Sequence, residues 1–226
     1  MFHFRDTVEG GVRVDVAFTD STLDLQGTRP GFVSALADLE AACGVPFARL
    51  TQVHGDAVVV VERPPVPEEV PVGDALVTVR RGLGLMVRVA DCVPLLLADS
   101  ETGVLGAVHS GRPGMLLDVA GRAVAVMREH GAGRIRAWLG PHVCGGCYEV
   151  PAAMHEEIGS QVPRSRSRTS WGTPALDIGA PVVARLADLG VEVRLVEGCT
   201  REDPGLHSYR RDGAAAGRFA GLVWAS

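Results

Sequence analysis

Between residues 57 and 108 the sequence consists largely of short apolar runs separated by glycine, proline and aspartate. Runs of this kind that are rich in valine and leucine are typical of β-strands. The strands predicted in this region are residues 57–62, 75–79, 85–89, 94–98 and 104–108. Strands that follow one another so closely predict a fold centred on β-sheet.

Helices are predicted where apolar residues recur every three or four positions. The first is residues 32–42, which Gly44 can end, and the second is residues 116–127, which ends before Gly131. The remaining predicted elements are strands at residues 12–18, 135–139, 191–196 and 219–224 and helices at residues 152–159 and 176–189.

Two segments lack periodicity and are predicted to be exposed loops: residues 64–71, with four prolines, and residues 163–173, rich in serine and arginine. The first is too short to link two separate cores, and the sequence shows no internal repeat. Neither a hairpin meander nor a strict strand-helix-strand series fits the order of elements. We therefore predict one α+β domain over residues 1–226, with mixed sheets.

The chain has 22 basic and 27 acidic residues, and every basic residue is an arginine. Its net charge of −5 provides no basic field for nucleic acid or for an anionic membrane, so neither is an expected partner. The absence of lysine excludes Schiff-base chemistry, pyridoxal phosphate anchoring and a P-loop.

Residues 1–11 have neither the basic nor the apolar region of a signal peptide, and the most apolar stretch, residues 82–98, is interrupted by Arg88 and Asp91. A cytoplasmic protein is therefore predicted. The five cysteines are an odd number at wide spacings, which fits reduced thiols better than a disulfide framework.

Three residues that bind soft metal ions stand at the ends of apolar runs: His54 in QVHG, Cys92 in ADCVP and His109 in AVHSG. Side chains at strand ends can converge although they are far apart in the chain. Two imidazoles and a thiolate leave the fourth position of a tetrahedral zinc open, as in catalytic sites. Buried histidine and cysteine side chains without a metal are common in protein cores, so spacing alone favours that interpretation over a metal site and leaves the metal site open.

Cys144 and Cys147 are a second candidate pair, in LGPHVCGGCYEV. Their neighbourhood is similar to the Cys-x-x-Cys half of the zinc deaminases, but no His-x-Glu precedes it to supply the other half. A single Cys-x-x-Cys is weak evidence for zinc, and a surface turn or an incidental redox pair stays open. We predict that this pair is neither a stabilising disulfide nor the catalytic metal site.

Four segments of the sequence resemble, in order and spacing, the bacterial laccase-domain family. They are TQVHGDAVVVV, GDALVTVRRGLGLMVRVADCVPLLLADSETGVLGAVHSG, LGPHVCGGCYEV and CTREDPGLHSYRRDGAAAGRFAGLVW. Members of this family are described as polyphenol oxidases, as zinc-dependent purine nucleoside phosphorylases with adenosine deaminase activity, and as peptidoglycan editing factors. The resemblance implies a sandwich of mixed sheets flanked by helices, similar to that of toxin-type cysteine deamidases.

The resemblance also implies that His54, Cys92 and His109 bind one zinc ion, in agreement with the ligand types read from the sequence. The chain departs from the family at HSGRPG, where Ser110, Arg112 and Pro113 replace residues of the usual HAGWRG. This departure puts in doubt the transfer of the family's substrate preference, since the flank of the ligand His109 has changed.

An open zinc position suits a purine nucleoside phosphorylase, which needs an electrophile for the nucleoside and arginine donors for phosphate. We expect Arg210 and Arg211 to bind phosphate through their forked donors, although a charged turn also explains this pair. Gln52 is a candidate for binding the nucleoside. For adenosine deamination, Asp91 beside the catalytic Cys92 is the nearest carboxylate able to move a proton. The oligomeric state is not predicted.

Two other catalytic functions stay open, and a binding module without catalytic activity is a third alternative. Cys92 could attack an amide with His109 as its base, without metal, in an amidase or in a hydrolase that edits peptidoglycan precursors. A copper polyphenol oxidase is less favoured, since the chain has seven histidines and no His-x-His. A single copper site would need an axial ligand such as Met86 or Met115.

Overall fold

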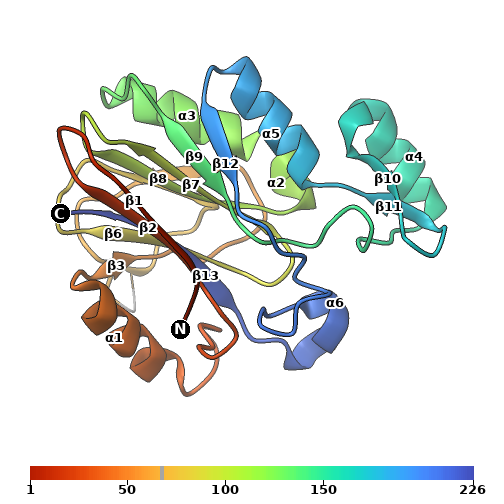
Figure 1. The fold of residues 1–226 in the computed structure, drawn as a ribbon, viewed down its shortest axis with the longest axis horizontal. Helices are drawn as coiled ribbons and strands as arrows, with labels where there is room; N and C mark the ends of the chain where they lie inside the picture. Colours follow the sequence, from red (N-terminus) through yellow and green to blue (C-terminus); the bar gives the residue numbers. More distant parts are fainter. Residues whose placement is uncertain (67–68) are drawn as a thin grey trace.

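Two β-sheets packed face to face form the centre of the protein, seen here in a computed structural model that describes residues 1–66 and 69–226 (Figure 1). The first sheet has the strand order β1-β2-β13-β6-β3, made of β1 (Phe2–Val8), β2 (Val14–Thr19), β13 (Phe219–Ala225), β6 (Gly84–Val89) and β3 (Phe47–Ala48). The second has the order β12-β9-β7-β8-β5-β4, made of β12 (Glu192–Leu195), β9 (Arg136–Leu139), β7 (Val93–Asp99), β8 (Val104–Ser110), β5 (Ala75–Thr78) and β4 (Val58–Val60). Both sheets mix antiparallel with parallel neighbours, the parallel pairs being β3 with β6, β4 with β5 and β9 with β12.

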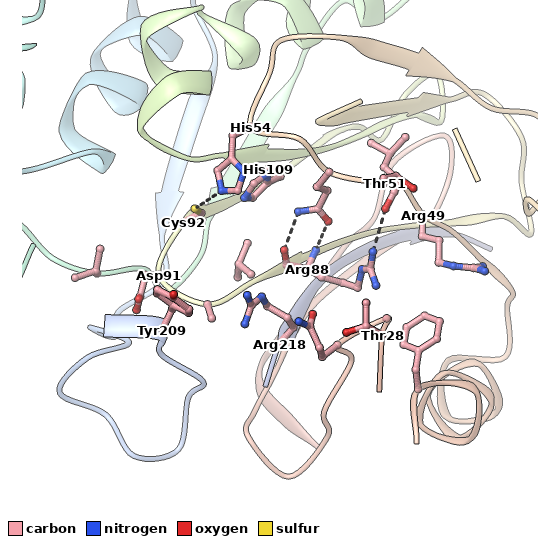
Figure 2. A pocket seen from close by; sticks show the side chains of 18 of the residues that line it. Thr28, Arg49, Thr51, His54, Arg88, Asp91, Cys92, His109, Tyr209 and Arg218 are labelled. Carbon is pink, nitrogen blue, oxygen red and sulfur yellow. Dashed lines mark hydrogen bonds between the residues drawn. The ribbon is translucent and has the colours of Figure 1, made fainter. Parts of the chain in front are cut away.

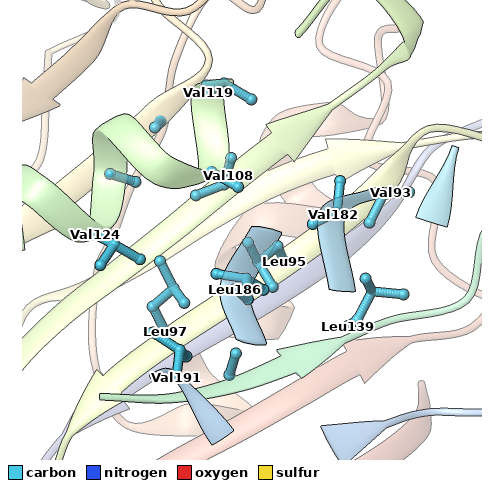
Figure 3. Close-up of a cluster of buried hydrophobic side chains, with 14 of the residues drawn as sticks. Val93, Leu95, Leu97, Val108, Val119, Val124, Leu139, Val182, Leu186 and Val191 are labelled. Carbon is cyan, nitrogen blue, oxygen red and sulfur yellow. The ribbon is translucent and has the colours of Figure 1, made fainter. Parts of the chain in front are cut away.

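Helices cover the outer face of each sheet, as Figure 1 shows. Helix α1 (Phe32–Cys43) packs on the first sheet, where Phe32 and Leu39 join a buried cluster with Trp224. Helices α3 (Val119–Glu129) and α5 (Gly179–Asp188) cover the second sheet (Figure 3). The other elements are α2 (Arg112–Leu116), α4 (Ala152–Gln161), α6 (Tyr209–Asp212) and the hairpin of β10 (Arg166–Arg168) and β11 (Pro174–Leu176).

Strand β7 shows why the apolar runs of the sequence are continuous rather than alternating. Its residues Leu96 and Ala98 face the space between the two sheets, whereas Leu95 and Leu97 point to the opposite side, against α3 and α5 (Figure 3). A strand covered on both faces requires apolar residues at every position. Each fully buried leucine contributes about 1.5 to 3 kcal/mol relative to an exposed one.

The α+β class, with mixed sheets flanked by helices, is therefore confirmed. The similarity to toxin-type deamidases stays a prediction. Gly44 has a φ of 74° and ends α1 as expected, with its N–H bonded to the Glu40 carbonyl 2.8 Å away.

Three predicted elements differ from the structure. The helix expected at residues 116–127 is broken at Asp118, which has a φ of 58° and caps α3 by accepting the Gly121 N–H. The helix expected at residues 176–189 starts only at Gly179, because Leu176 still pairs in the β10–β11 hairpin. That hairpin also orders part of the predicted loop 163–173. Within the other predicted loop, residues 67 and 68 lie outside the described residues. Strand β1 was not predicted.

The strand pairing of the second sheet brings residues that are far apart in the sequence together at one end of its strands. Ala75 of β5 pairs with Val108 of β8, which places the preceding Asp74 beside His109. Val93 of β7 pairs with Ser110 of β8, which places the preceding Cys92 at the same end of the strands. Chain segments far apart in the sequence therefore meet where three strands begin or end. No helix of the described residues is long and apolar enough to cross a membrane.

Candidate active site

His54, Cys92 and His109 converge at the end of the second sheet where β5 and β7 begin and β8 ends (Figure 2). One ligand atom from each lies within 4.8 Å of the other two, and Cys92 Sγ is 3.7 Å from His54 Nε2. The two imidazole rings stand 4.7 Å apart at 75°. Nitrogen and sulfur ligands of one tetrahedral zinc lie about 3.3 to 3.8 Å from each other. The residues present therefore fit a zinc ion in both donor chemistry and size.

Asp74, which the sequence analysis did not single out, organises this cluster. Its Oδ1 lies 2.8 Å from His109 Nδ1 and accepts the backbone N–H of His54 at 2.9 Å. Its Oδ2 accepts the N–H groups of Gly55 at 2.6 Å and Val53 at 3.3 Å. The carboxylate thus turns His109 Nε2 toward the cluster and supports the left-handed backbone of His54, whose φ is 62°.

The electrostatics of the cluster favour a thiolate. Burial opposes ionisation of Cys92, but hydrogen bonds and positive charge from His109 and His54 outweigh it and lower the pKa of Cys92 to about 6. Burial opposes protonation of His109, but its contacts with Asp74 and Cys92 raise the pKa of His109 to about 9. A thiolate in this position can serve either as a metal ligand or as a nucleophile.

A cavity of about 1170 Å³ opens beside the cluster. Pockets of up to about 1,000 Å³ enclose molecules of drug size, so this cavity has room for a nucleoside together with an anion. Its lining includes the three cluster residues, the aromatic residues Phe32, Tyr148 and Tyr209, and the arginines Arg49, Arg88, Arg112, Arg210 and Arg218.

Arg88, Arg49 and Arg218 form what we call the arginine wall, which Figure 2 shows apart from the histidine and cysteine cluster. Burial, together with the charges of Arg49 and Arg218, lowers the pKa of Arg88 to about 10, and no carboxylate of the described residues offsets this. Arg88 Nε is buried and has no hydrogen-bond partner among those residues. Neighbouring cations with a spare donor are typical of a site for an anion. The sequence feature that could have pointed to this anion site is Arg88, the single charged residue in the otherwise apolar strand β6.

Gln52 lines the cavity, and both ends of its side-chain amide are bonded to the backbone of Arg88. Its Nε2 donates to the Arg88 carbonyl at 2.8 Å, and its Oε1 accepts the Arg88 N–H at 2.9 Å. These bonds hold strand β6, which carries Arg88 of the arginine wall, so the geometry favours a positioning role for Gln52.

Asp91 lies in the turn before Cys92 with a φ of 89°, and its carboxylate is bonded to the C-terminal loop. Its Oδ1 accepts the hydroxyls of Thr200 and Ser208, each at 2.7 Å, and its Oδ2 accepts the Arg210 N–H at 2.6 Å. With both oxygens engaged, Asp91 is placed to shape the loop around Cys92 rather than to move a proton.

The two arginines predicted to bind phosphate are placed differently. Arg210 lines the large cavity, lies 4.4 Å from the centroid of the Tyr148 ring and donates to the Glu149 carbonyl. Arg211 does not line that cavity, and its five N–H groups all donate to the protein. The acceptors are Asp212 and the carbonyls of Thr200, Asp203 and Leu206. Since no donor is left for phosphate, the geometry favours a role for Arg211 in holding the loop.

We expect Gly111→Ala to weaken metal binding without removing a ligand. A Cβ at Gly111 would lie 2.7 Å from His54 Cδ2 and 3.0 Å from Cys92 Sγ, so the cluster must move. Disturbing the support of a metal site typically lowers affinity about 10- to 100-fold. Zinc affinity measured by chelator competition checks this. Gly31→Ala, at a helix start with no atom within 4 Å, is the matched control. Equal affinity in both variants would contradict the prediction.

The fold and the site define a two-sheet sandwich protein in which two histidines and a cysteine, a ligand set suited to a metal ion, lie beside a large cavity. Residues 27–226 match the family described as multi-copper polyphenol oxidoreductase laccase, and the chain belongs to this family.

Curated relatives match nearly the whole chain. It is 49% identical over 240 residues to a Streptomyces coelicolor protein named purine nucleoside phosphorylase, covering 97% of this chain and 98% of the relative. A Mycobacterium tuberculosis protein of the same name is 45% identical over 225 residues, covering 96% of this chain and 89% of the relative.

Solved structures share the fold. YlmD from Geobacillus stearothermophilus matches with a TM-score of 0.79 and 25% identity, over 95% of this chain and 92% of that one. A Neisseria meningitidis protein of the DUF152 family matches with a TM-score of 0.80 and 24% identity, over 97% and 98%. The laccase-domain family predicted from the sequence is thus confirmed.

Proposed function

We propose that this protein is a zinc-dependent purine nucleoside phosphorylase, which cleaves a nucleoside such as adenosine or inosine with phosphate to give the free base and ribose 1-phosphate. The observation that carries the proposal is that one cavity contains a metal-binding cluster and, apart from it, an arginine wall with an unpaired buried donor. The name shared by the Streptomyces and Mycobacterium relatives supports it.

In phosphorolysis a phosphate oxygen bonds to the anomeric carbon of ribose while the bond from that carbon to the base breaks. The electron pair stays on the base, which takes up a proton. We assign binding and orientation of phosphate to the arginine wall, since guanidinium groups match phosphate oxygens in pairs. A zinc ion held by His54, Cys92 and His109 would supply a Lewis acid that polarises the nucleoside. Tyr148 and Tyr209 offer flat apolar surfaces for the base.

Arg88→Met should raise the KM for phosphate about 10- to 100-fold, because a hydrogen bond to a charged group contributes about 1.5 to 3 kcal/mol. Bound zinc should not change. The measurement is hypoxanthine release from inosine at varied phosphate concentration, with the exposed Arg134→Met as control. If Arg210→Met has the larger effect, phosphate binds at the C-terminal loop instead. Equal release with and without phosphate would reject phosphorolysis in favour of hydrolysis.

Deamination of adenosine is a second proposed activity of the same cavity. Because the Asp91 carboxylate is engaged by Thr200, Ser208 and Arg210, another group must move the proton in that reaction. Incubating the protein with adenosine and phosphate and then separating adenine, inosine and hypoxanthine shows which reaction comes first. Adenine marks direct phosphorolysis of adenosine, whereas hypoxanthine marks deamination followed by phosphorolysis of inosine. Inosine formed without phosphate would establish the deaminase activity.

One observation favours a cysteine amidase as the alternative function. Asp74, His109 and Cys92 form a chain of contacts in which a carboxylate orients an imidazole beside a thiolate, as in cysteine hydrolases. This chain does not require His54, whereas the metal centre does. A copper oxidase is the least favoured alternative, since the described residues bring only His54 and His109 together as imidazole ligands. We propose a cytoplasmic location, with nucleoside and phosphate as the ligands.

A further inference from the structure

A second group of metal-ligating side chains lies outside the large cavity. Cys144, Cys147, Cys199 and Glu202 each place one ligand atom within 4.8 Å of the other three. Cys147 is buried, Cys144 and Cys199 are partly buried, and Glu202 is exposed. We propose that these four residues bind a structural zinc ion, separate from the one assigned to the active site. This proposal does not depend on the proposed function.

The backbone already holds the four ligands in two facing turns. In the first, the N–H of Cys147 donates to the Cys144 carbonyl at 2.9 Å, and in the second the N–H of Glu202 donates to the Cys199 carbonyl at 3.0 Å. Each turn therefore presents a first and a fourth residue, the ligand spacing of structural zinc sites. The Cys144 N–H also donates to Cys199 Sγ at 3.4 Å, which joins the two turns. The sequence pattern does not reveal this group because Cys199 is far from the Cys-x-x-Cys pair along the chain.

The size and chemistry of the group fit zinc better than a disulfide. Sulfur ligands of one tetrahedral zinc lie about 3.8 Å apart, within the spacing observed here. All three cysteines are free thiols in the structure. A disulfide could join only two of them and would leave the third thiol unpaired beside it. Three thiolates are a donor set typical of closed structural zinc sites, with Glu202 as the fourth ligand.

Positive charge stands next to the group. A cavity of about 470 Å³ is lined by Cys147 and Glu202 together with Arg201, Arg210 and Arg211. Zinc with four anionic ligands carries a net charge of about −2, which guanidinium groups in this position can offset. Arg211 in addition donates to the Thr200 carbonyl, so it braces the turn that carries Cys199.

The ion would hold one wall of the active site in place. Cys147 is followed by Tyr148, which lines the large cavity beneath Arg210. Cys199 is followed by Thr200, whose hydroxyl donates to Asp91 next to Cys92. A zinc ion that links the two turns would therefore fix the position of Tyr148 in the cavity wall and of Thr200, which is bonded to Asp91 in the turn before Cys92.

Metal analysis of the reduced protein tests the proposal. Wild-type protein should contain two zinc ions per chain, and His54→Ala should keep one. After cobalt substitution, the sulfur-to-cobalt charge-transfer band of the His54→Ala protein should have the intensity of three thiolates. The band of a Cys144→Ser, Cys199→Ser protein should have that of Cys92 alone. A His54→Ala protein without zinc, or with a one-thiolate band, would overturn the proposal.

A milder variant keeps the test valid if the cysteine variants fail to fold. Glu202 is exposed, so Glu202→Gln should fold, and we expect it to lower the affinity of the second zinc at least tenfold in competition with a chelator. Glu129→Gln, an exposed residue at the end of α3, is the control. Equal affinities in the two variants, or a disulfide among the three cysteines in protein kept under reducing conditions, would contradict the four-residue site.

Discussion

His54→Ala should lower kcat/KM for phosphorolysis of inosine about a thousandfold, with loss of one zinc ion per chain. The loss of the Lewis acid removes several kcal/mol of transition-state stabilisation, and each 1.4 kcal/mol is about a factor of ten in rate. The variant should fold, because the His54 side chain is exposed and its backbone contact to Asp74 does not depend on the ring. Hypoxanthine release and zinc content of the same preparation check both effects.

This variant also separates the two candidate functions. The contacts of Asp74, His109 and Cys92 persist without His54, so a cysteine amidase would keep most of its activity in His54→Ala and lose it in Cys92→Ala. A phosphorylase that needs the metal would lose activity in both. His130→Ala, an exposed histidine at the end of α3, should change neither zinc content nor rate. Full phosphorolysis by His54→Ala protein that has lost the active-site zinc ion would contradict the metal-dependent mechanism.

Asp74→Asn should lower both the stability of the protein and its affinity for the active-site metal. An asparagine of the same shape turns one NH₂ group toward the partly buried N–H donors that the Asp74 carboxylate accepts, and an unsatisfied donor costs up to about 1 to 3 kcal/mol when it is fully buried. Losing the carboxylate that orients His109 should weaken metal binding about 10- to 100-fold in addition. Denaturant unfolding measures the first effect and chelator competition the second.

Asp99→Asn is a matched control for this variant. Asp99 is also buried, and it accepts the backbone N–H groups of Glu101, Thr102, Gly133 and Arg134 far from the metal cluster. We expect a similar loss of unfolding free energy with unchanged metal affinity. A loss of metal affinity equal to that of Asp74→Asn would mean that destabilisation alone, rather than orientation of His109, weakens the site.

Most of the strands could be predicted because their composition is local information. Strands β5 to β8 are short, rich in valine and leucine, and bounded by turn residues, and each was found within two residues of its end. Strand β1 was missed because its outward-facing residues, such as His3 and Arg5, dilute the apolar signal of an edge strand. The break at Asp118 was missed since the apolar spacing on its two sides continues in phase.

By itself the sequence determined the class of fold, the family and the three donor residues His54, Cys92 and His109, because side-chain chemistry and local patterning can be read residue by residue. Only the tertiary structure decided which residues surround those donors. Strand register placed the Asp74 carboxylate against the His109 ring and the His54 backbone N–H. Arg88 was noted in the sequence only as an interruption of an apolar run. The same holds for Cys199, which meets Cys144 and Cys147 across two turns. Contacts between segments far apart in the chain depend on hydrogen-bond register and packing, which no short stretch of sequence encodes.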